Sequence, residues 1–328
     1  MESLLANGTI SEIISQLEGK FQAVPEVWFR GQSKFDYDLR PSIFRQGIGH
    51  GYSFNESKMY REFQRRHPEV HLERDDVSEW LPIMQHYGLP TRLLDWTTNL
   101  LVGLYFCCSR RKEEDGALFA FNPSMLIRDY ALNPLMKIQI LSSNTSEFYR
   151  QLIYKTEGML DDDSLINGVA IRSIKEDSIL QTRFMHIMLS QQIPLVSVEV
   201  RTTLRNTVDL NGNLIPFFNQ DITRVFSNII PIQSRHLTDR IKLQHGCFTL
   251  HGGAYFDGKE FIPPGDPDGL LFQLTKFKIP ATIKPSILRE LEICGIREAS
   301  LFPEMEYQAR DIKSRFTEEM KAAVLSEE

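Results

Sequence analysis

The chain has 328 residues, of which 42% are hydrophobic and 24% are charged, and its formal net charge at pH 7 is -6. This composition is ordinary for a globular protein of one large domain or two smaller ones. The negative charge argues against a broad electrostatic footprint for duplex DNA or RNA. Because no segment reaches the roughly 18 apolar residues that cross a bilayer and the N-terminus lacks a secretory pattern, we expect a cytoplasmic protein with no membrane partner.

The cysteines give no sign of a metal site or of a disulfide framework. Cys107, Cys108, Cys247 and Cys294 form no Cys-x-x-Cys pair, and none has a histidine at the spacing of metal ligands. Cys107 and Cys108 lie inside an apolar run, where a free cysteine behaves as a small hydrophobic residue. We therefore expect no bound metal.

Two elements are predicted before the first conspicuous motif. Residues 9–19 carry isoleucine and leucine at helical spacing behind a threonine or serine cap, which predicts an N-terminal helix. Residues 27–29 favour a short strand that leads into Arg30 and Gly31. A guanidinium beside a glycine at a strand end can meet a phosphate or a carboxylate of a ligand. Equally, Arg30 can pair with an acid of the protein such as Asp95.

An irregular segment over residues 33–45 follows, and a helix is predicted over about residues 55–67. In the irregular segment Pro41 keeps Arg40 extended. Arg40 and Arg45 can help to line a site for an anionic ligand, or they can be surface cations.

The stretch from Trp80 to Cys108 sets a polar loop between two apolar helices. Gly88 can end the first helix in a left-handed turn. The second helix is expected to begin near Thr98 and is apolar on nearly all sides, so it must be buried. The polar side chains around the loop are Gln85, His86, Thr91, Arg92, Asp95 and Thr97. Held between buried helices, they suit a binding or catalytic site; the alternative is a structural ion pair between Arg92 and Asp95.

Further strands and helices are predicted downstream. A strand at residues 116–121 is followed by an insertion or lid near residues 122–192. More strands are expected at residues 194–200, 228–232, 247–250 and 269–279, a helix between Pro285 and Gly295, and a charged helix that ends near Leu325. A second Gln-His pair, Gln244 and His245, precedes Gly246 and repeats the pair formed by Gln85 and His86.

Several motifs together are specific enough to suggest a family. They are Trp28-Phe-Arg-Gly-Gln, Leu39-Arg-Pro-Ser-Ile-Phe-Arg, Gln85-His-Tyr-Gly-Leu-Pro-Thr-Arg-Leu-Leu-Asp-Trp-Thr, Arg240 to Phe248, and Gly295-Ile with Ser300-Leu-Phe-Pro. Over about residues 26–305 they resemble the FRG domain, a bacterial and phage-associated family named for its Phe-Arg-Gly motif. We therefore expect an N-terminal helix over residues 1–25, the FRG domain over residues 26–305, and a C-terminal helix over residues 306–328.

A more distant resemblance connects the chain with ADP-ribosyltransferase toxins that modify DNA or RNA. It rests on a first strand that ends in Arg-Gly and on the later pattern Arg-x-x-x-Gln-x-Gly-x-Phe at Arg240. The resemblance implies an α+β fold, with a mixed, mainly antiparallel sheet flanked by helices. It implies NAD as cofactor, with Phe29, Arg30, Gly31, Gln32, Arg40, Gln85 and Arg92 in the binding site. It implies a catalytic set of Gln244, His245, Asp95 and His86.

The sequence departs from the transferase pattern at one position. The glutamate that such enzymes present is absent at Gly246, which leaves Asp95, Glu304 and Glu306 as candidates for a carboxylate that stabilises positive charge when the glycosidic bond breaks. The function expected from the resemblance is an NAD-dependent ADP-ribosyltransferase-like toxin or phage-defence effector, or an NAD glycohydrolase. RNA or DNA is the candidate acceptor, and an antitoxin or chaperone the candidate protein partner. The alternative is a non-catalytic module that senses a nucleotide or a phage protein.

Overall fold

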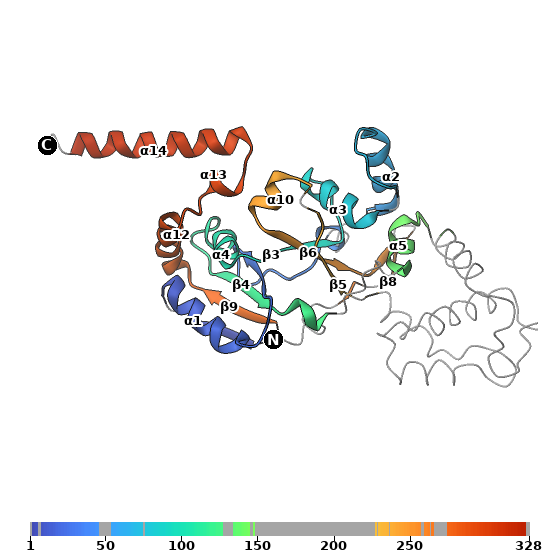
Figure 1. The fold of residues 1–328 in the computed structure, drawn as a ribbon, viewed down its shortest axis with the longest axis horizontal. Helices are drawn as coiled ribbons and strands as arrows, with labels where there is room; N and C mark the ends of the chain where they lie inside the picture. Colours follow the sequence, from blue (N-terminus) through green and yellow to red (C-terminus); the bar gives the residue numbers. More distant parts are fainter. Residues whose placement is uncertain are drawn as a thin grey trace, which may run out of the picture.

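The computed structural model of the chain (Figure 1) describes residues 2–5, 8–45, 54–74, 76–126, 134–144, 147, 227, 229–235, 237–256, 259–262, 264–265 and 274–325. The helices in these residues are α1 (Ile10–Phe21), α2 (Glu56–Arg66), α3 (Val77–His86), α4 (Leu100–Cys108), α5 (Pro134–Leu141), α10 (Asp239–Leu243), α12 (Lys284–Ile293), α13 (Glu298–Leu301) and α14 (Met305–Leu325). The strands are β1 (Glu2–Leu5), β2 (Trp28–Gln32), β3 (Leu93–Thr97), β4 (Gly116–Phe121), β5 (Ile229–Ile232), β6 (Gly246–His251), β7 (Ala254–Phe256), β8 (Lys259–Ile262) and β9 (Thr275–Ile279).

One seven-stranded sheet organises the described part of the chain. Its strand order is β1-β9-β4-β2-β3-β6-β5. The pair of β1 and β9 is parallel, whereas all the other neighbours in this sheet are antiparallel. Strands β7 and β8 form a separate hairpin. The prediction of an α+β fold with a mixed, mainly antiparallel sheet flanked by helices is therefore confirmed.

The sheet is nearly divided between β2 and β3. Strand β2 pairs with β4 along all of its residues, from Trp28 to Gln32, but it meets β3 at a single pair, Phe29 with Thr97. Strand β3 pairs instead with β6 along its whole length. Beyond the Phe29–Thr97 pair the two strands have no paired residues, and we call the place where they part the fork. It separates a β2 part of the sheet (β1, β9, β4 and β2) from a β3 part (β3, β6 and β5).

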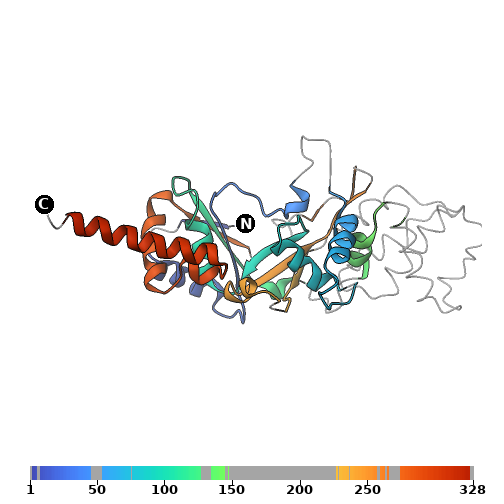
Figure 2. The same cartoon turned by 90° about the horizontal axis from the view of Figure 1, so that it is seen from above.

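Each part of the sheet has its own helical cover (Figures 1 and 2). Helices α1, α4 and α12 pack on the β2 part around an apolar cluster that includes Ile13, Leu104 and Phe277. Helices α2, α3 and α5 share a second cluster with the β3 part. At the joint, the ring of Phe121 contacts Trp28 and Trp96, at centroid distances of 5.8 and 4.5 Å. This aromatic contact holds the two parts together where their strands part.

Gly31 allows β2 to lie directly on α4. A Cβ atom at this position would come within 1.9 Å of the main-chain oxygen of Gly103 and within 2.5 Å of the main-chain nitrogen of Cys107. Atoms cannot approach so closely, and both obstacles are backbone of α4 that cannot rotate away. The glycine of the Phe-Arg-Gly motif is therefore explained by packing.

Several predicted elements are confirmed, with small shifts. Helix α1 is capped by Thr9, whose side chain accepts from the Glu12 amide, and it ends at Phe21 rather than at Gly19. Gly88 takes the predicted left-handed conformation, with φ of 88°. Helix α4 is capped by Asn99 rather than Thr98, because the Asn99 side chain accepts from the Leu101 amide.

The interpretation of the polar segment after Gly88 as a loop is wrong for residues 93–97. Leu93–Thr97 form strand β3, in which every residue except Asp95 is buried. Strands are recognised by alternating polar and apolar residues, and a strand that is buried on both faces lacks this alternation. The segment was therefore interpreted as a polar loop between two helices.

Some predictions lie outside the described residues. These are the strand at residues 194–200, the first part of the strand predicted from residue 269, and most of the proposed insertion, in which α5 is described. The four cysteines are free thiols, and only Cys294 among them is exposed. Among the described helices, none combines the length and apolarity that a bilayer crossing demands.

Candidate functional site

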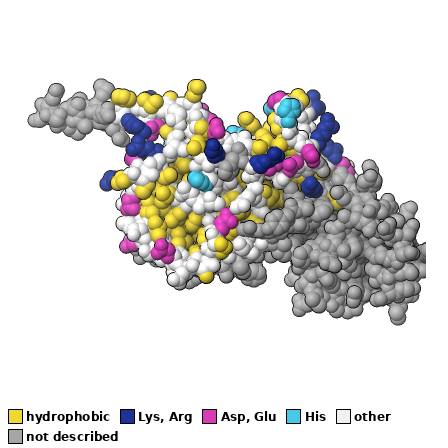
Figure 3. All heavy atoms as spheres, viewed as in Figure 1, with side chains coloured by type: hydrophobic (Ala, Val, Ile, Leu, Met, Phe, Trp, Pro, Cys, Tyr) yellow, Lys and Arg dark blue, Asp and Glu magenta, His cyan; other side chains and the backbone are white. Residues whose placement is uncertain are grey.

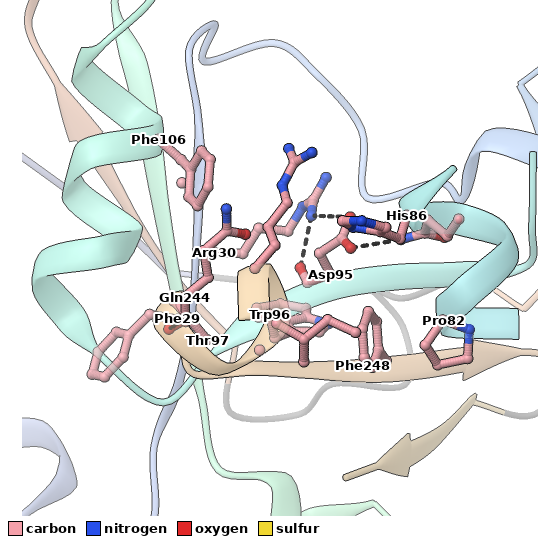
Figure 4. Close-up of a pocket in the computed structure, with 15 residues that line it drawn as sticks. Phe29, Arg30, Pro82, His86, Asp95, Trp96, Thr97, Phe106, Gln244 and Phe248 are labelled. Atoms are coloured by element: carbon pink, nitrogen blue, oxygen red, sulfur yellow. Dashed lines mark hydrogen bonds and ion pairs between the residues drawn. The ribbon is translucent and has the colours of Figure 1, made fainter. Parts of the chain in front are cut away.

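The side chain of Arg30 lies across the fork from β2 to β3. Its Nη1 donates to the main-chain oxygen of Asp95 over 2.7 Å and lies 3.7 Å from the Asp95 Oδ2 atom. The Arg30 side chain is 15% exposed, whereas that of Asp95 is 62% exposed. Figure 4 shows the two residues facing each other beside the cavity described below. The arginine thus takes the place of the strand pairing that is missing here.

Helix α3 holds the other side of the same carboxylate. The Gln85 side-chain amide donates to Asp95 Oδ1 over 2.5 Å, and the Thr91 hydroxyl donates to the Gln85 Oε1 atom. Arg30, Asp95 and Gln85 therefore form a continuous polar bridge from β2 through β3 to α3. We call these three residues the bridge.

A cavity of about 330 Å³ opens on one side of the bridge. Strands β2, β3 and β6 and helices α3, α4 and α10 contribute to its wall (Figure 4). It brings together most of the residues that the sequence predicted. Those that line it are Phe29, Arg30, Gly31, Gln85, His86, Asp95 and Gln244.

A second hollow, of about 510 Å³, also contacts the bridge. It shares all three bridge residues with the first cavity, and Ser42 and Arg45 contribute to its wall. A ligand that filled both spaces would therefore cross the bridge. Such a ligand must be elongated and must tolerate, or use, the guanidinium of Arg30 near its middle.

Arg30 has a hydrogen-bond donor for which the described residues supply no acceptor. Its Nε atom is buried and has no hydrogen-bond partner among the described residues. Burial lowers the pKa of Arg30, the charge of Asp95 opposes this effect, and the neighbouring cation Arg45 lowers the pKa further. An arginine stays protonated under such conditions. A buried donor without an acceptor is costly, and two cations close together favour an anion, so the fork is suited to an anionic ligand.

A second group of charges lies at the His86 side of the cavity. Burial lowers the pKa of His86, the Arg240 cation lowers it further, and the Glu304 carboxylate raises it. Glu304 Oε2 is buried and has no hydrogen-bond partner among the described residues. The Arg240 guanidinium lies 4.6 Å from the centre of the Phe302 ring. His86 is thus kept neutral near pH 7, where it can accept a proton.

Gln244 and His245 are used differently from one another. Gln244 lines the cavity, and its side-chain amide donates to the Leu301 main-chain oxygen over 3.1 Å. His245 is exposed and does not line the cavity. Its φ of 48° forms the turn before β6, and its carbonyl accepts from the Thr98 amide over 3.1 Å. Gln244 therefore contributes its side chain to the cavity wall, whereas His245 contributes only the backbone conformation of the turn before β6.

Arg92 lies away from both hollows, in the protein core. It is 1% exposed, and its Nε and Nη2 atoms bind the Glu56 carboxylate at distances between 2.5 and 3.0 Å. Its Nη1 donates to the Gln139 side chain and to the main-chain oxygens of His251 and Gly253. The alternative of an ion pair with Asp95 is therefore wrong, because Arg92 pairs with Glu56. The geometry gives Arg92 a structural role in place of the cofactor contact that the resemblance implied.

Two other predicted cofactor-binding residues do not line the described hollows. Arg40 is paired with Asp38, with 3.6 Å between Nε and Oδ2. Gln32 is buried, and its side-chain amide donates to the Asp38 main-chain oxygen over 3.0 Å. Both residues therefore fix the segment that follows β2.

Sequence reasoning missed part of the cavity wall. Phe106 belongs to the all-apolar helix α4, where nothing distinguishes a cavity residue from a core residue. Trp96 and Phe248 line the cavity from strands β3 and β6. Arg240 also lines the cavity. It is the first residue of the motif Arg-x-x-x-Gln-x-Gly-x-Phe, and this position could have indicated that it belongs to the site.

A comparison with protein families gives one match. Residues 25–116 match the family model of the FRG domain. This segment contains α4, both strands of the fork and all three bridge residues, and it ends at the first residue of β4. Arg240, Gln244 and Glu304 follow the matched segment. Searches of curated proteins and of solved structures each found no match.

Proposed function

We propose that the fork binds NAD and that the protein is an ADP-ribosyltransferase or an NAD glycohydrolase. The observation that carries this proposal is the buried, unpartnered Nε of Arg30 between two hollows that share the bridge. A guanidinium matches the geometry of a phosphate better than any other side chain. In this proposal Arg30 and Arg45 bind the pyrophosphate of the dinucleotide.

The size and lining of the hollows support a dinucleotide. Ligand sites usually occupy about 300–1,000 Å³ and combine apolar walls with a few placed polar groups. The first cavity has the aromatic residues Trp96, Phe106 and Phe248 in its wall. In this proposal one or more of these rings contacts the nicotinamide, and the adenosine end occupies the second hollow.

The charged residues support bond cleavage as well as binding. NAD supplies a ribose bonded to a positively charged nicotinamide, which leaves with the electron pair of that bond. A carboxylate close to the ribose stabilises the positive charge left on the sugar. Asp95 is the first candidate because it lies in the fork, and Glu304 is the second. Neutral His86 can take the proton that water or an acceptor group loses.

The proposed activity is tested by incubating the purified protein with labelled NAD, alone and with mixed nucleic acid or a cell lysate. We expect release of nicotinamide, and transfer of label if an acceptor is present. Asp95→Asn, which removes the charge but keeps the shape, should reduce the rate by roughly 100-fold or more. Arg40→Gln is the matched control, because Arg40 lies outside both hollows. Absence of nicotinamide release from the parent protein would contradict the enzymatic proposal.

A non-catalytic nucleotide sensor is the second candidate function. It is favoured by the bridge itself, because the Asp95 carboxylate is already engaged by Arg30 and Gln85, and by the absence of a glutamate at Gly246. Thermal stabilisation by NAD without nicotinamide release would favour the sensor.

The setting of this chemistry in a toxin or phage-defence system rests on the sequence resemblance. In that setting RNA or DNA receives the ADP-ribose, and an antitoxin or chaperone restrains the protein. Expression in a bacterial host tests the toxin role: growth arrest by the parent, and none by Arg30→Gln at equal protein levels, is the expected outcome. Normal growth with the parent protein would contradict it.

A further inference from the structure

Helix α14 leaves the body of the protein and extends away from it (Figures 1 and 2). Only its first turns have described contacts with α13 and the segment that follows it. The Tyr307 ring stacks on Phe302 with 4.6 Å between centroids, and the Gln308 side chain donates to the main-chain oxygens of Ala299 and Phe302. Arg310 binds Glu298 over 2.9 Å. These contacts fix where the helix begins, and the turn that follows, residues 312–317, is exposed.

The projecting part of α14 carries an exposed apolar stripe. Every residue from 312 to 317 is exposed. Met305, Ile312 and Phe316 are 89%, 56% and 64% exposed, and their spacing places them on one side of the helix. Apolar side chains are visible along this projection in Figure 3. In the sequence, Met320 continues the same spacing.

A helix of this kind needs a partner. Helices in proteins owe most of their stability to packing of one face, and an isolated polar helix is marginal in water. Helix α14 is long, and the face that would normally be packed carries a methionine, an isoleucine and a phenylalanine in solvent. A partner must therefore present a complementary apolar stripe over several helical turns.

The charges of α14 make a second copy of the same helix the best match. The first half of the helix has a net charge of +1 and the second half a net charge of -1. The first half carries Arg310, Lys313 and Arg315 against Glu306 and Asp311, and the second half carries Glu318 and Glu319 against Lys321. When two copies pair in opposite directions, the net positive half of each helix lies beside the net negative half of the other. Such a pair has two-fold symmetry, the commonest symmetry of protein dimers.

We infer that α14 is a dimerisation helix, which pairs in an antiparallel manner with α14 of a second copy of this chain. The apolar stripe forms the centre of the contact, and the charged residues on its flanks set the direction, as in other paired helices. This inference does not depend on the proposed function, because none of the stripe residues lines the cavity or the second hollow.

The inference is tested by sedimentation velocity on the full chain. We expect a dimer at micromolar concentrations, and Phe316→Glu should weaken the association by at least roughly tenfold. Ser314→Glu is the matched control: it adds the same charge two residues away on the opposite side of the helix, and the dimer should persist. Helix content from circular dichroism shows that each variant is folded.

Three results would overturn the inference. The first is a parent protein that stays monomeric over the whole concentration range. This result would overturn the inference even if another protein were found to bind α14. The second is a dimer that Phe316→Glu leaves intact. The third is a dimer that Ser314→Glu disrupts as strongly as Phe316→Glu. Since opposite charges across the contact are screened by salt, dimerisation should also weaken as ionic strength rises.

Discussion

Arg30 lies in β2 and Arg92 lies directly before β3, and the two guanidinium groups differ in how many hydrogen-bond acceptors they have. Every guanidinium nitrogen of Arg92 has an acceptor, and its charge is balanced by buried Glu56. Among the described residues Arg30 is hydrogen-bonded only to Asp95, whose side chain is mostly exposed, and its buried Nε has no acceptor there. A saturated arginine stabilises the fold, whereas an arginine with a missing acceptor is ready to bind one. The number of guanidinium nitrogens that have an acceptor separates the two roles, although both residues are largely buried.

His251 lies within electrostatic reach of both arginines. Burial, together with the charges of Arg30 and Arg92, lowers its pKa to about 3. Its Nε2 atom is 2.9 Å from the Thr249 hydroxyl. Because His251 stays neutral, the two arginines are not joined by a third positive charge.

The largest loss of stability is expected when Arg92 is replaced. Arg92→Met should lower the free energy of unfolding by roughly 3–5 kcal/mol, because it leaves the Glu56 carboxylate buried without its counter-ion. Denaturant unfolding measures this loss. The double variant Arg92→Met with Glu56→Leu should recover part of it, since no buried charge is then left unpaired. A loss below about 1 kcal/mol for the single variant would remove the distinction between the two arginines.

A smaller loss of stability is expected when a side chain is added at Gly31, where β2 contacts α4. Gly31→Ala should cost roughly 1–3 kcal/mol, because its Cβ atom would overlap the backbone of α4. Gly19→Ala in α1 is the matched control, since a Cβ atom there meets nothing within 4 Å. It should be neutral or stabilise the protein by about 0.5–1 kcal/mol. Equal unfolding midpoints for the two variants would show that β2 and α4 are less closely packed than described.

The lowered pKa of His251 predicts a pH dependence of stability. Its pKa is about 3 in the folded protein and 6.5 ordinarily, so the unfolded chain binds a proton first as the pH falls. The stability contributed by neutral His251 is therefore complete above pH 6.5 and is lost between pH 6.5 and 3. Between pH 7 and about pH 5.5 the loss should be about 1 kcal/mol. His251→Gln should flatten this part of the stability curve; an unchanged slope would mean that other groups cause it.

The smallest effect on stability is expected at the unsaturated arginine. Arg30→Gln should change the free energy of unfolding by less than about 1 kcal/mol, because its ion pair with Asp95 is partly exposed and screened. Denaturant unfolding beside Arg92→Met gives the contrast directly. A loss for Arg30→Gln as large as for Arg92→Met would mean that both arginines are structural.

The sequence could single out Arg30 and Asp95 as candidate site residues but could not separate them from Arg92. Arg30 follows a short apolar segment and Arg92 precedes one, so their local sequences are alike. They differ in the acceptors around them, because those of Arg92 come from distant parts of the chain: Glu56, Gln139 and the main chain of His251 and Gly253. The same limit applies to the wall of the cavity. Gln85 and His86 stand out as polar residues, whereas Phe106 is indistinguishable from its core neighbours until α4 is placed beside the fork.

Element prediction succeeded where local signals decide the structure. The cap of α1, the left-handed Gly88 and the burial of α4 follow from residue types close in sequence. Strand β3 was missed because Leu93, Leu94, Trp96 and Thr97 are all buried, and its pairing with β6 depends on residues far along the chain. The fork itself, which depends on where two strands stop pairing, has no signature in either strand alone.

The central claim is that Arg30 binds a dinucleotide in the fork, and calorimetric titration of the purified protein with NAD tests it most directly. The parent protein and Arg40→Gln should bind NAD with similar affinity, and Arg30→Gln should bind at least roughly tenfold more weakly while remaining folded. A parent protein that does not bind NAD, or an Arg30→Gln variant that binds it as well as the parent does, would contradict the claim.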